Sequence, residues 1–429
     1  MKLIKYPKKQ DWATLLARPS FDNSNLMNTV RIILEDVRTR GDEAVKEYEL
    51  KFDKVHLDSL LVSSKEIEEV DGLISEDLKE AIKQAAQNIE KFHAAQDQEL
   101  PCVETMKGVK CWQKAKPIQK VGLYVPGGTA PLFSTVLMLA IPAKIAGCSE
   151  IVLCTPPNKE GKVHPAVLYA AKVAGVNQVF KIGGVQAIGA MAYGTESVSK
   201  VYKIFGPGNQ FVTAAKQVVS LKDVAIDMPA GPSEVEVIAD ETANPAFVAA
   251  DLLSQAEHGV DSQAILITSS EDLAEKVLVE VERQLCLLPR EELAKKSLDH
   301  SRIIVVRDLE EVIDITNEYA PEHLIIATKD YMSIADKIHS AGSLFLGHYT
   351  PESAGDYASG TNHTLPTSGY AHAYSGVNLD SFRKKMTYQE ITKEGLRSIG
   401  HIVEVMAENE ELFAHKNAMS LRVNEIINN

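Results

Sequence analysis

The stretch between residues 121 and 240 constrains the fold most, because short runs of β-forming residues alternate there with alanine-rich helical stretches. The strand-like runs cover residues 121–125, 151–154, 178–182, 200–205 and 234–238, and the helical stretches cover residues 132–146, 164–174, 187–193 and 210–220. Strands separated by helices of this length are typical of βαβ units and a parallel sheet. We therefore expect a doubly wound α/β domain, with its glycine-rich turns where such sheets bind ligands.

A second α/β region follows. Asn244 and Pro245 are suited to begin a helix, and Gly259 is suited to end it. Strand-like runs at residues 264–268, 302–306 and 324–328 flank a long charged helix that begins at Asp272. Residues 347–378 are predicted to form a loop rich in Gly, Ser, Tyr and His, and a loop of about 30 residues is expected to be either functional or disordered.

The flanking segments carry helical patterns. Apolar residues recur at helical spacing in residues 23–48 and 67–92, and residues 105–113 form a short strand-like run. The last 40 residues are predicted to be helical, with no room for a sheet.

Composition excludes several classes of protein. The 429 residues include 45 Lys and Arg against 59 Asp and Glu, a net charge of −14 that argues against nucleic-acid partners. The most apolar stretch, residues 131–147, is interrupted by polar residues and a proline, so we expect no membrane span. The basic N-terminus has no apolar segment after it, and the five cysteines are irregularly spaced. We therefore expect reduced thiols and a cytoplasmic location.

Three groups of residues could carry chemistry in the second region. Gln255 and His258 are three residues apart on one predicted helix face and could reach one metal ion, although a simple polar helix end is the preferred interpretation of these two alone. Asp356 lies in the glycine-flanked part of the long loop, where it could bind a metal or make a turn. Glu322 and His323 precede a strand and offer two acid–base groups, with a solvated strand entry as the alternative.

Glycine-rich turns at residues 126–128, 182–186 and 206–209 each follow a strand and precede a helix. Backbone N–H groups at such turns can hold a dinucleotide phosphate. None of the three matches the GxGxxG fingerprint, so tight turning is the alternative. The charged segment at residues 410–417 indicates only a solvated helix face.

Taken together, these motifs resemble those of the histidinol dehydrogenase family over nearly the whole chain. Any one motif is weak, but their order and spacing are specific. The segments that carry the resemblance are residues 121–128, 205–209, 227–234, 251–259, 320–324, 355–357 and 414–418.

The resemblance implies a zinc- and NAD-dependent oxidation of L-histidinol to L-histidine through L-histidinal, with two NAD, in the last steps of histidine biosynthesis. It implies a homodimer with shared active sites, one zinc ion per subunit and Glu322 and His323 as the catalytic pair. The implied zinc ligands are Gln255, His258, Asp356 and His415, the last from the partner subunit; the implied NAD contacts are Tyr124, Gln186 and Asn209. Substrate contacts would add Ser233 and Glu410 to His323 and the four zinc ligands.

We accordingly expect two doubly wound, incomplete Rossmann-like parallel-sheet domains with small helical extensions, in an intertwined homodimer. The expected segments are an N-terminal extension at residues 1–21, a first α/β domain with the metal and catalytic residues at 22–119 and 237–377, an NAD-binding α/β domain at 120–236, and a C-terminal helical tail at 378–429 that contributes to the partner's active site.

Three other functions compete with this interpretation. A related zinc and NAD dehydrogenase could act on another small alcohol, such as a sulfonated diol. A thiol-dependent aldehyde dehydrogenase would need Cys148 or Cys154 as nucleophile. A zinc-stabilised dimer that binds nucleotides would need no catalytic residues at all.

Overall fold

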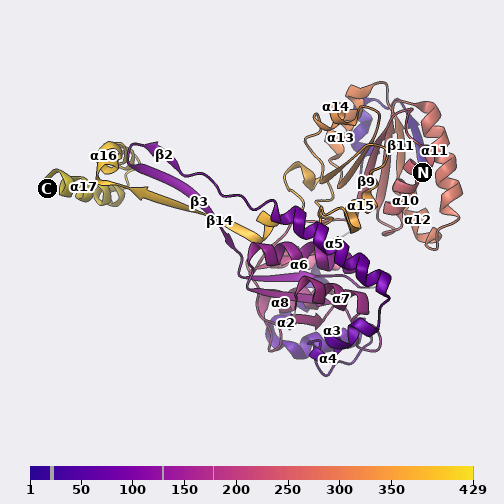
Figure 1. Ribbon diagram of the computed structural model, residues 1–429, viewed down its shortest axis with the longest axis horizontal. Coiled ribbons are helices and arrows are strands. Elements are labelled where there is room, and N and C mark those ends of the chain that lie inside the picture. Colours follow the sequence, from indigo (N-terminus) through magenta and orange to yellow (C-terminus); the bar gives the residue numbers. More distant parts are fainter. Residues whose placement is uncertain (20–23, 128–129, 177, 429) are drawn as a thin grey trace. The chain divides into compact units, whose positions relative to one another are not determined.

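The computed structural model describes residues 1–19, 24–127, 130–176 and 178–428. They form two compact units: a main unit of residues 1–94 and 118–382, and a tail unit of residues 95–117 and 383–429 (Figure 1). The predicted domain boundary at residues 21 and 22, the helix start at residue 23, Gly128 of the first glycine-rich turn and the chain end at residue 429 lie outside the described residues. Within the described residues, no helix combines the length and the apolar character that a membrane span needs.

One sheet of the main unit has six parallel strands in the order β1-β11-β10-β9-β12-β13. Its strands are β1 (Lys2–Lys5), β9 (Glu234–Ala239), β10 (Gln263–Thr268), β11 (Arg302–Val305), β12 (His323–Ala327) and β13 (Ser343–Leu346). Every residue of β9, β10 and β12 is buried, as expected for parallel strands covered on both faces. The N-terminal segment predicted as an extension therefore contributes an edge strand, β1, beside β11.

Alternate residues of these strands pack against helices on opposite faces of the sheet. In β10, Ala264 and Leu266 face the core shared with α10 (Pro245–Ala256), α11 (Glu271–Leu285) and α12 (Glu291–His300). Ile265 and Ile267 face the core shared with α1 (Trp12–Leu15), α13 (Leu309–Tyr319) and α14 (Tyr331–Ala335). The predicted doubly wound arrangement is confirmed for this sheet.

The start of α10 is confirmed and its end is not. The Asn244 side chain accepts a hydrogen bond from the Ala246 N–H at 2.9 Å, and Pro245 occupies the first helical turn. The helix ends at Ala256, three residues before Gly259. Gly259 instead begins a turn that leads into β10, in which the Ser262 N–H donates to the Gly259 carbonyl.

The second sheet has five parallel strands in the order β6-β5-β4-β7-β8. Its strands are β4 (Lys120–Tyr124), β5 (Glu150–Thr155), β6 (Gln178–Lys181), β7 (Lys203–Phe205) and β8 (Ala225–Ile226). One core contains α5 (Glu76–Ala94), α6 (Phe133–Ala146) and α7 (Pro165–Ala174), and the other contains α2 (Ser24–Arg40), α3 (Asp42–Phe52), α8 (Gly184–Tyr193) and α9 (Gln210–Ser220). This sheet is also doubly wound.

The helices of residues 24–94 thus pack on the five-stranded sheet, which differs from their predicted grouping with residues 237–377. Their apolar stripes fit helices of that sheet closely. A Cβ built on Gly189 of α8 would lie 3.2 Å from Val37 and 3.3 Å from Leu34 of α2, so this glycine permits the close approach. A short helix, α4 (Ser64–Glu69), completes the segment.

Two further predictions need correction. The segment predicted as a loop at residues 347–378 contains a short helix, α15 (Glu352–Tyr357), in which Glu352 and Gly355 are buried. The segment predicted as a helical tail at residues 378–429 starts with residues of the main unit, since Phe382 stacks on Phe205 with ring centroids 4.2 Å apart.

The tail unit contains an antiparallel sheet, of which the sequence analysis predicted only a strand-like run at residues 105–113. The prediction of a purely helical tail over residues 378–429 is wrong for residues 383–391, which form a strand. Its strands are β2 (Val103–Met106), β3 (Val109–Pro117) and β14 (Arg383–Ile391), followed by α16 (Lys393–Asn409) and α17 (Phe413–Asn428) (Figure 1). Trp112 of β3 stacks on Tyr388 of β14, with ring centroids 5.5 Å apart. β14 is strongly polar and pairs with a strand far upstream, so local pattern did not reveal it. The two terminal helices are confirmed.

The buried carboxyl of Glu236, in the middle of β9, should make the stability of the fold depend on pH. Glu236 is fully buried, and burial raises the pKa of its carboxyl from 4.5 to about 8, although the Thr316 hydroxyl donates a hydrogen bond to it. As the pH rises from 4.5 to 8, the unfolded chain loses this proton while the folded chain keeps it, so the carboxyl increasingly destabilises the fold. We expect Glu236→Gln to raise the free energy of unfolding at pH 8 by on the order of 3 kcal/mol and to leave it nearly unchanged at pH 4.5.

Urea unfolding at the two pH values measures this effect. Glu241→Gln, at an exposed carboxylate just after the same strand, is the matched control and should change neither value. A Glu236→Gln protein that is less stable at pH 8 than the unsubstituted protein would contradict the prediction.

Candidate active site

The candidate catalytic residues lie at the amino edge of the six-stranded sheet. Glu322 precedes β12 and His323 is its first residue, and His323 pairs with Val235 near the start of β9. α10 runs back from β9, so its last turn brings Gln255 to the same edge. α15 follows β13 and supplies Glu352 and Asp356. Segments far apart in the sequence therefore meet because parallel strands begin side by side.

His258, which follows α10, forms a possible metal site with Glu352 and Asp356 of α15. Ligand atoms of His258, Glu352 and Asp356 all lie within 4.8 Å of one another. The amide of Gln255 lies beside them: in the orientation that satisfies its neighbours, its nitrogen donates to Glu352 Oε1 at 2.7 Å and its oxygen accepts from the Glu234 N–H at 3.2 Å. Imidazole, carboxylate and amide oxygen form a donor set that suits Zn²⁺. Three predicted ligands, Gln255, His258 and Asp356, are thus brought together.

The fourth predicted ligand, His415, lies in α17, and the predicted substrate contact Glu410 follows α16. Both belong to the tail unit. The remaining predicted substrate contact, Ser233, is partly buried and directly precedes Glu234, the first residue of β9.

Glu352 is a site residue that sequence reasoning missed. It precedes Asp356 by four residues, a spacing that places both on one helix face. That signal was hidden because the segment was predicted to be a loop. Burial raises the pKa of Glu352 to about 8, with His323 acting against the shift and the nearby carboxylates of Asp356, Glu322 and Asp251 adding to it.

His323 and Glu322 form a buried acid–base pair. His323 Nδ1 lies 3.1 Å from the Glu234 carbonyl oxygen, which can only accept, so Nδ1 carries a proton there and Nε2 faces the site. Nε2 lies 3.4 Å from Asp356 Oδ1, and Nδ1 lies 3.6 Å from Glu322 Oε2. Glu322 Oε2 also accepts from the Glu234 N–H at 2.8 Å. The backbone of Glu234 therefore orients both side chains.

Electrostatics favour the proton on His323. Burial opposes its charged form, but the carboxylates of Glu322, Glu352 and Asp356 outweigh burial and raise the pKa of His323 well above its usual value. Burial would raise the pKa of Asp356, yet the nearby His323 imidazole, with Nε2 3.4 Å from Oδ1, lowers it. These carboxylates stabilise the charge of the imidazolium that forms when His323 takes up a proton.

Two of the three histidines in residues 347–378, His363 and His372, make side-chain hydrogen bonds of their own. His363 Nδ1 donates to the Asp356 carbonyl at 2.9 Å, and its Nε2 accepts from the Thr135 hydroxyl at 3.1 Å. Desolvation lowers the pKa of His363 and favours its neutral form. His372 hydrogen bonds with Ser340 instead, at 3.1 Å.

The predicted NAD contacts gather at the carboxyl ends of the five-stranded sheet. Tyr124 ends β4 and its hydroxyl accepts from the Gly184 N–H at 3.1 Å. Gln186, in the first turn of α8, donates to Glu49 Oε1 at 2.8 Å and leaves its own buried oxygen without a partner. Asn209 caps α9 through hydrogen bonds of 3.0 and 3.1 Å. This edge is where doubly wound sheets bind nucleotides.

A buried ion pair between Lys216 and Asp227 hydrogen bonds with the backbone of Gly206, at the start of the turn at residues 206–209. Lys216 Nζ lies 2.5 Å from Asp227 Oδ1 and donates to the Gly206 carbonyl at 2.8 Å, while Asp227 Oδ2 accepts from the Gly206 N–H. Gly206 has φ 125°, and a Cβ there would collide with the Tyr124 carbonyl oxygen. Only glycine fits, so this glycine is explained by backbone geometry at the predicted NAD site.

Cys148 and Cys154, the two candidate nucleophiles, do not have the properties of a reactive thiol. Burial raises the pKa of Cys148 to about 11 and that of Cys154 further still. Thiolates, the reactive form, are thus disfavoured at both positions. This observation argues against the thiol-dependent alternative.

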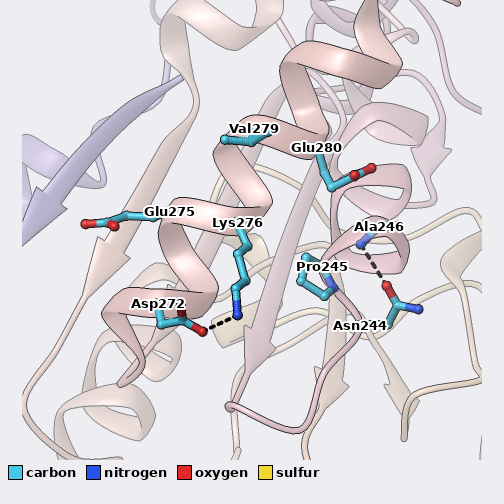
Figure 2. Close-up of a pocket in the computed structure, with 8 residues that line it drawn as sticks. All are labelled: Asn244, Pro245, Ala246, Asp272, Glu275, Lys276, Val279 and Glu280. Atoms are coloured by element: carbon cyan, nitrogen blue, oxygen red, sulfur yellow. Dashed lines mark hydrogen bonds and ion pairs between the residues drawn. The ribbon is translucent and has the colours of Figure 1, made fainter.

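A surface groove of about 430 Å³ lies elsewhere, between the start of α10 and the exposed face of α11. Figure 2 shows two interactions within it: Lys276 pairs with Asp272 at 2.6 Å, and the Asn244 side chain caps α10. The groove contains none of the candidate catalytic or metal-binding residues.

Comparison with known proteins decides the family. A family model described as histidinol dehydrogenase matches residues 16–423. The chain belongs to the histidinol dehydrogenase family. It is 66% identical over 426 residues to the histidinol dehydrogenase of Bacteroides thetaiotaomicron, covering 99% of this chain and 100% of that one. It is 55% identical to that of Escherichia coli K12, covering 96% and 95% of the two chains.

A solved structure agrees over the same length. The crystal structure of the histidinol dehydrogenase from Elizabethkingia anophelis matches with a TM-score of 0.97 and 55% sequence identity, covering 99% of this chain and 98% of that one. Family membership confirms that the chain is an oxidoreductase.

Proposed function

We propose that this chain oxidises L-histidinol to L-histidine through L-histidinal, with zinc and two NAD, in the last steps of histidine biosynthesis. The observation that carries the proposal is the buried Glu322–His323 pair beside the cluster of His258, Glu352 and Asp356, in a chain that matches the family over residues 16–423. A cytoplasmic homodimer is part of the proposal, and neither a nucleic acid nor a membrane is a partner.

Zinc would be held by Gln255, His258 and Asp356 together with His415 of the partner subunit. When bound, the ion supplies a positive charge that orients the substrate. The described residues fit this task because the buried Glu352 carboxylate has an oxygen without a hydrogen-bond partner in the same cluster. Ser233 and Glu410 complete the proposed substrate contacts, with His323 and the four zinc ligands.

His323 is the proposed base for both oxidations. The Glu234 carbonyl occupies Nδ1, so Nε2 is the atom that accepts the hydroxyl proton while a hydride leaves the carbinol carbon for NAD. The aldehyde then stays bound and is hydrated. Glu322 Oε2 is held by the Glu234 N–H, which leaves Oε1 to take a proton from the attacking water.

NAD would bind in the domain of residues 120–236, at Tyr124, Gln186 and Asn209. All three lie at one edge of the five-stranded sheet, and the turns beside them offer backbone N–H groups. Two NAD molecules enter in turn, so the first NADH leaves while the aldehyde is held.

The proposal is tested by mixing the purified protein with L-histidinol and NAD. We expect two NADH per histidinol, with activity lost on chelation and restored by zinc. If metal-replete, folded protein forms no NADH, the proposed substrate is wrong, and a related dehydrogenase acting on another alcohol, such as a sulfonated diol, takes its place.

A further inference from the structure

Glu352 is a buried acidic group of the main unit to which the proposed mechanism assigns no step. Its side chain is 1% exposed. One carboxylate oxygen, Oε1, contacts the Gln255 amide at 2.7 Å and the Ser254 hydroxyl at 3.3 Å. The other, Oε2, is buried without a hydrogen-bond partner among the described residues. A buried carboxylate in this state is costly unless a positive charge lies nearby.

The surroundings of Glu352 do not provide enough positive charge. The charged side chains that act on it are His323, which is favourable, and the carboxylates of Asp356, Glu322 and Asp251, which are unfavourable. One of its oxygens also lies within 4.8 Å of ligand atoms of His258 and Asp356. These three ligand atoms lie close enough together for one cation to bind them, and Glu352 belongs to this cluster.

The contact with Gln255 suggests what Glu352 does there. An amide side chain can present either its oxygen or its NH₂ group to a cation, and only the oxygen is a ligand. Beside a bound cation the Glu352 carboxylate is ionised and can only accept hydrogen bonds, so it selects the orientation in which the Gln255 nitrogen faces Glu352. The amide oxygen then points away from Glu352, toward the Glu234 N–H, with a second lone pair free.

We infer that Glu352 is a positioning residue of the metal site, which fixes the Gln255 amide so that its oxygen, and not its NH₂ group, is available to the ion. This inference rests on the proposed function, because it takes Gln255 as a zinc ligand. Substituting groups that orient ligands in this way typically weakens metal binding by about 10- to 100-fold.

The test is a double-mutant cycle on zinc affinity, measured by competition with a chromophoric chelator. Glu352→Gln keeps the shape of the side chain but can donate to Gln255 as well as accept, so it no longer selects one amide orientation. We expect Glu352→Gln to weaken zinc binding by about 10- to 100-fold. In a Gln255→Ala background the same change should have little further effect, because the amide it positions is gone.

The visible absorption of the Co²⁺-substituted proteins gives a second readout that does not depend on turnover. Glu352→Gln and Gln255→Ala should alter the spectrum in the same way. Glu257→Gln is the matched control: this carboxylate adjoins His258 in the sequence but is partly exposed and outside the cluster, so neither affinity nor spectrum should change. Thermal unfolding of the metal-free proteins checks that each variant is folded.

Two results would overturn the inference while leaving the proposed function intact. Unchanged zinc affinity in Glu352→Gln would remove Glu352 from the metal site. An equal loss in both backgrounds would show that Glu352 acts on the ion independently of Gln255. If the unsubstituted protein itself binds no zinc, the proposed function and the inference fail together.

Discussion

Replacing His323 by asparagine is expected to lower the rate of NADH formation from histidinol by about 10²- to 10⁴-fold. The asparagine NH₂ group can still donate to the Glu234 carbonyl, as Nδ1 does over 3.1 Å, so the local structure should be kept. What is lost is Nε2, the proposed proton acceptor for both oxidations. Steady-state turnover with histidinol measures the effect, and equilibrium dialysis should show that zinc and substrate still bind.

Glu322→Gln makes the companion variant, and it separates the two steps. Because Glu322 is proposed to act on the attacking water, its loss should slow the oxidation of histidinal more than that of histidinol. His372→Asn is a suitable control, since this histidine hydrogen bonds with Ser340 and lies outside the cluster. Unchanged turnover in both Glu322→Gln and His323→Asn would instead favour a zinc-stabilised dimer that binds nucleotides.

Mixing two inactive variants is expected to restore activity if the sites are shared between subunits. His258→Asn and His415→Asn should each be inactive, because each removes a proposed zinc ligand. In a mixed dimer, one of the two sites combines an intact His258 with an intact His415 of the partner subunit. With random exchange of subunits, about a quarter of the sites should be restored. Turnover after unfolding and refolding the two chains together measures this recovery.

The decisive control is a mixture in which recovery is impossible. His258→Asn chains combined with chains carrying both substitutions produce no site with both histidines intact, so they should stay inactive. The formation of mixed dimers is verified with differently tagged chains. An absence of activity in verified His258→Asn and His415→Asn mixed dimers would show that each site draws all its ligands from one subunit.

The local features of the fold were open to prediction from the sequence. The alternation of strands and helices in residues 121–238 predicted most of the five-stranded sheet, and the Asn244–Pro245 pair predicted the start of α10. These features depend on residues within a few positions of one another, through side-chain periodicity and helix capping. The Glu322–His323 pair, at the entry to β12, was visible for the same reason.

Features that depend on distant segments were decided by the tertiary structure. β1 adds to β11 across about 300 residues, β14 pairs with β3, and α2 packs on α8 rather than with the six-stranded sheet. None of these partners can be identified from local pattern, because each is selected by the fit of two remote surfaces.

The candidate site shows the same division. The sequence by itself determined the residue types and their local spacing, together with the resemblance that assigned them roles. Only the tertiary structure placed Glu352 beside Gln255 and His258, and the Glu234 backbone behind both Glu322 and His323. The reason is physical: a hydrogen bond or a shared ion acts over a few ångströms, and it is the parallel sheet that brings the starts of β9 and β12 and the end of α10 to that distance.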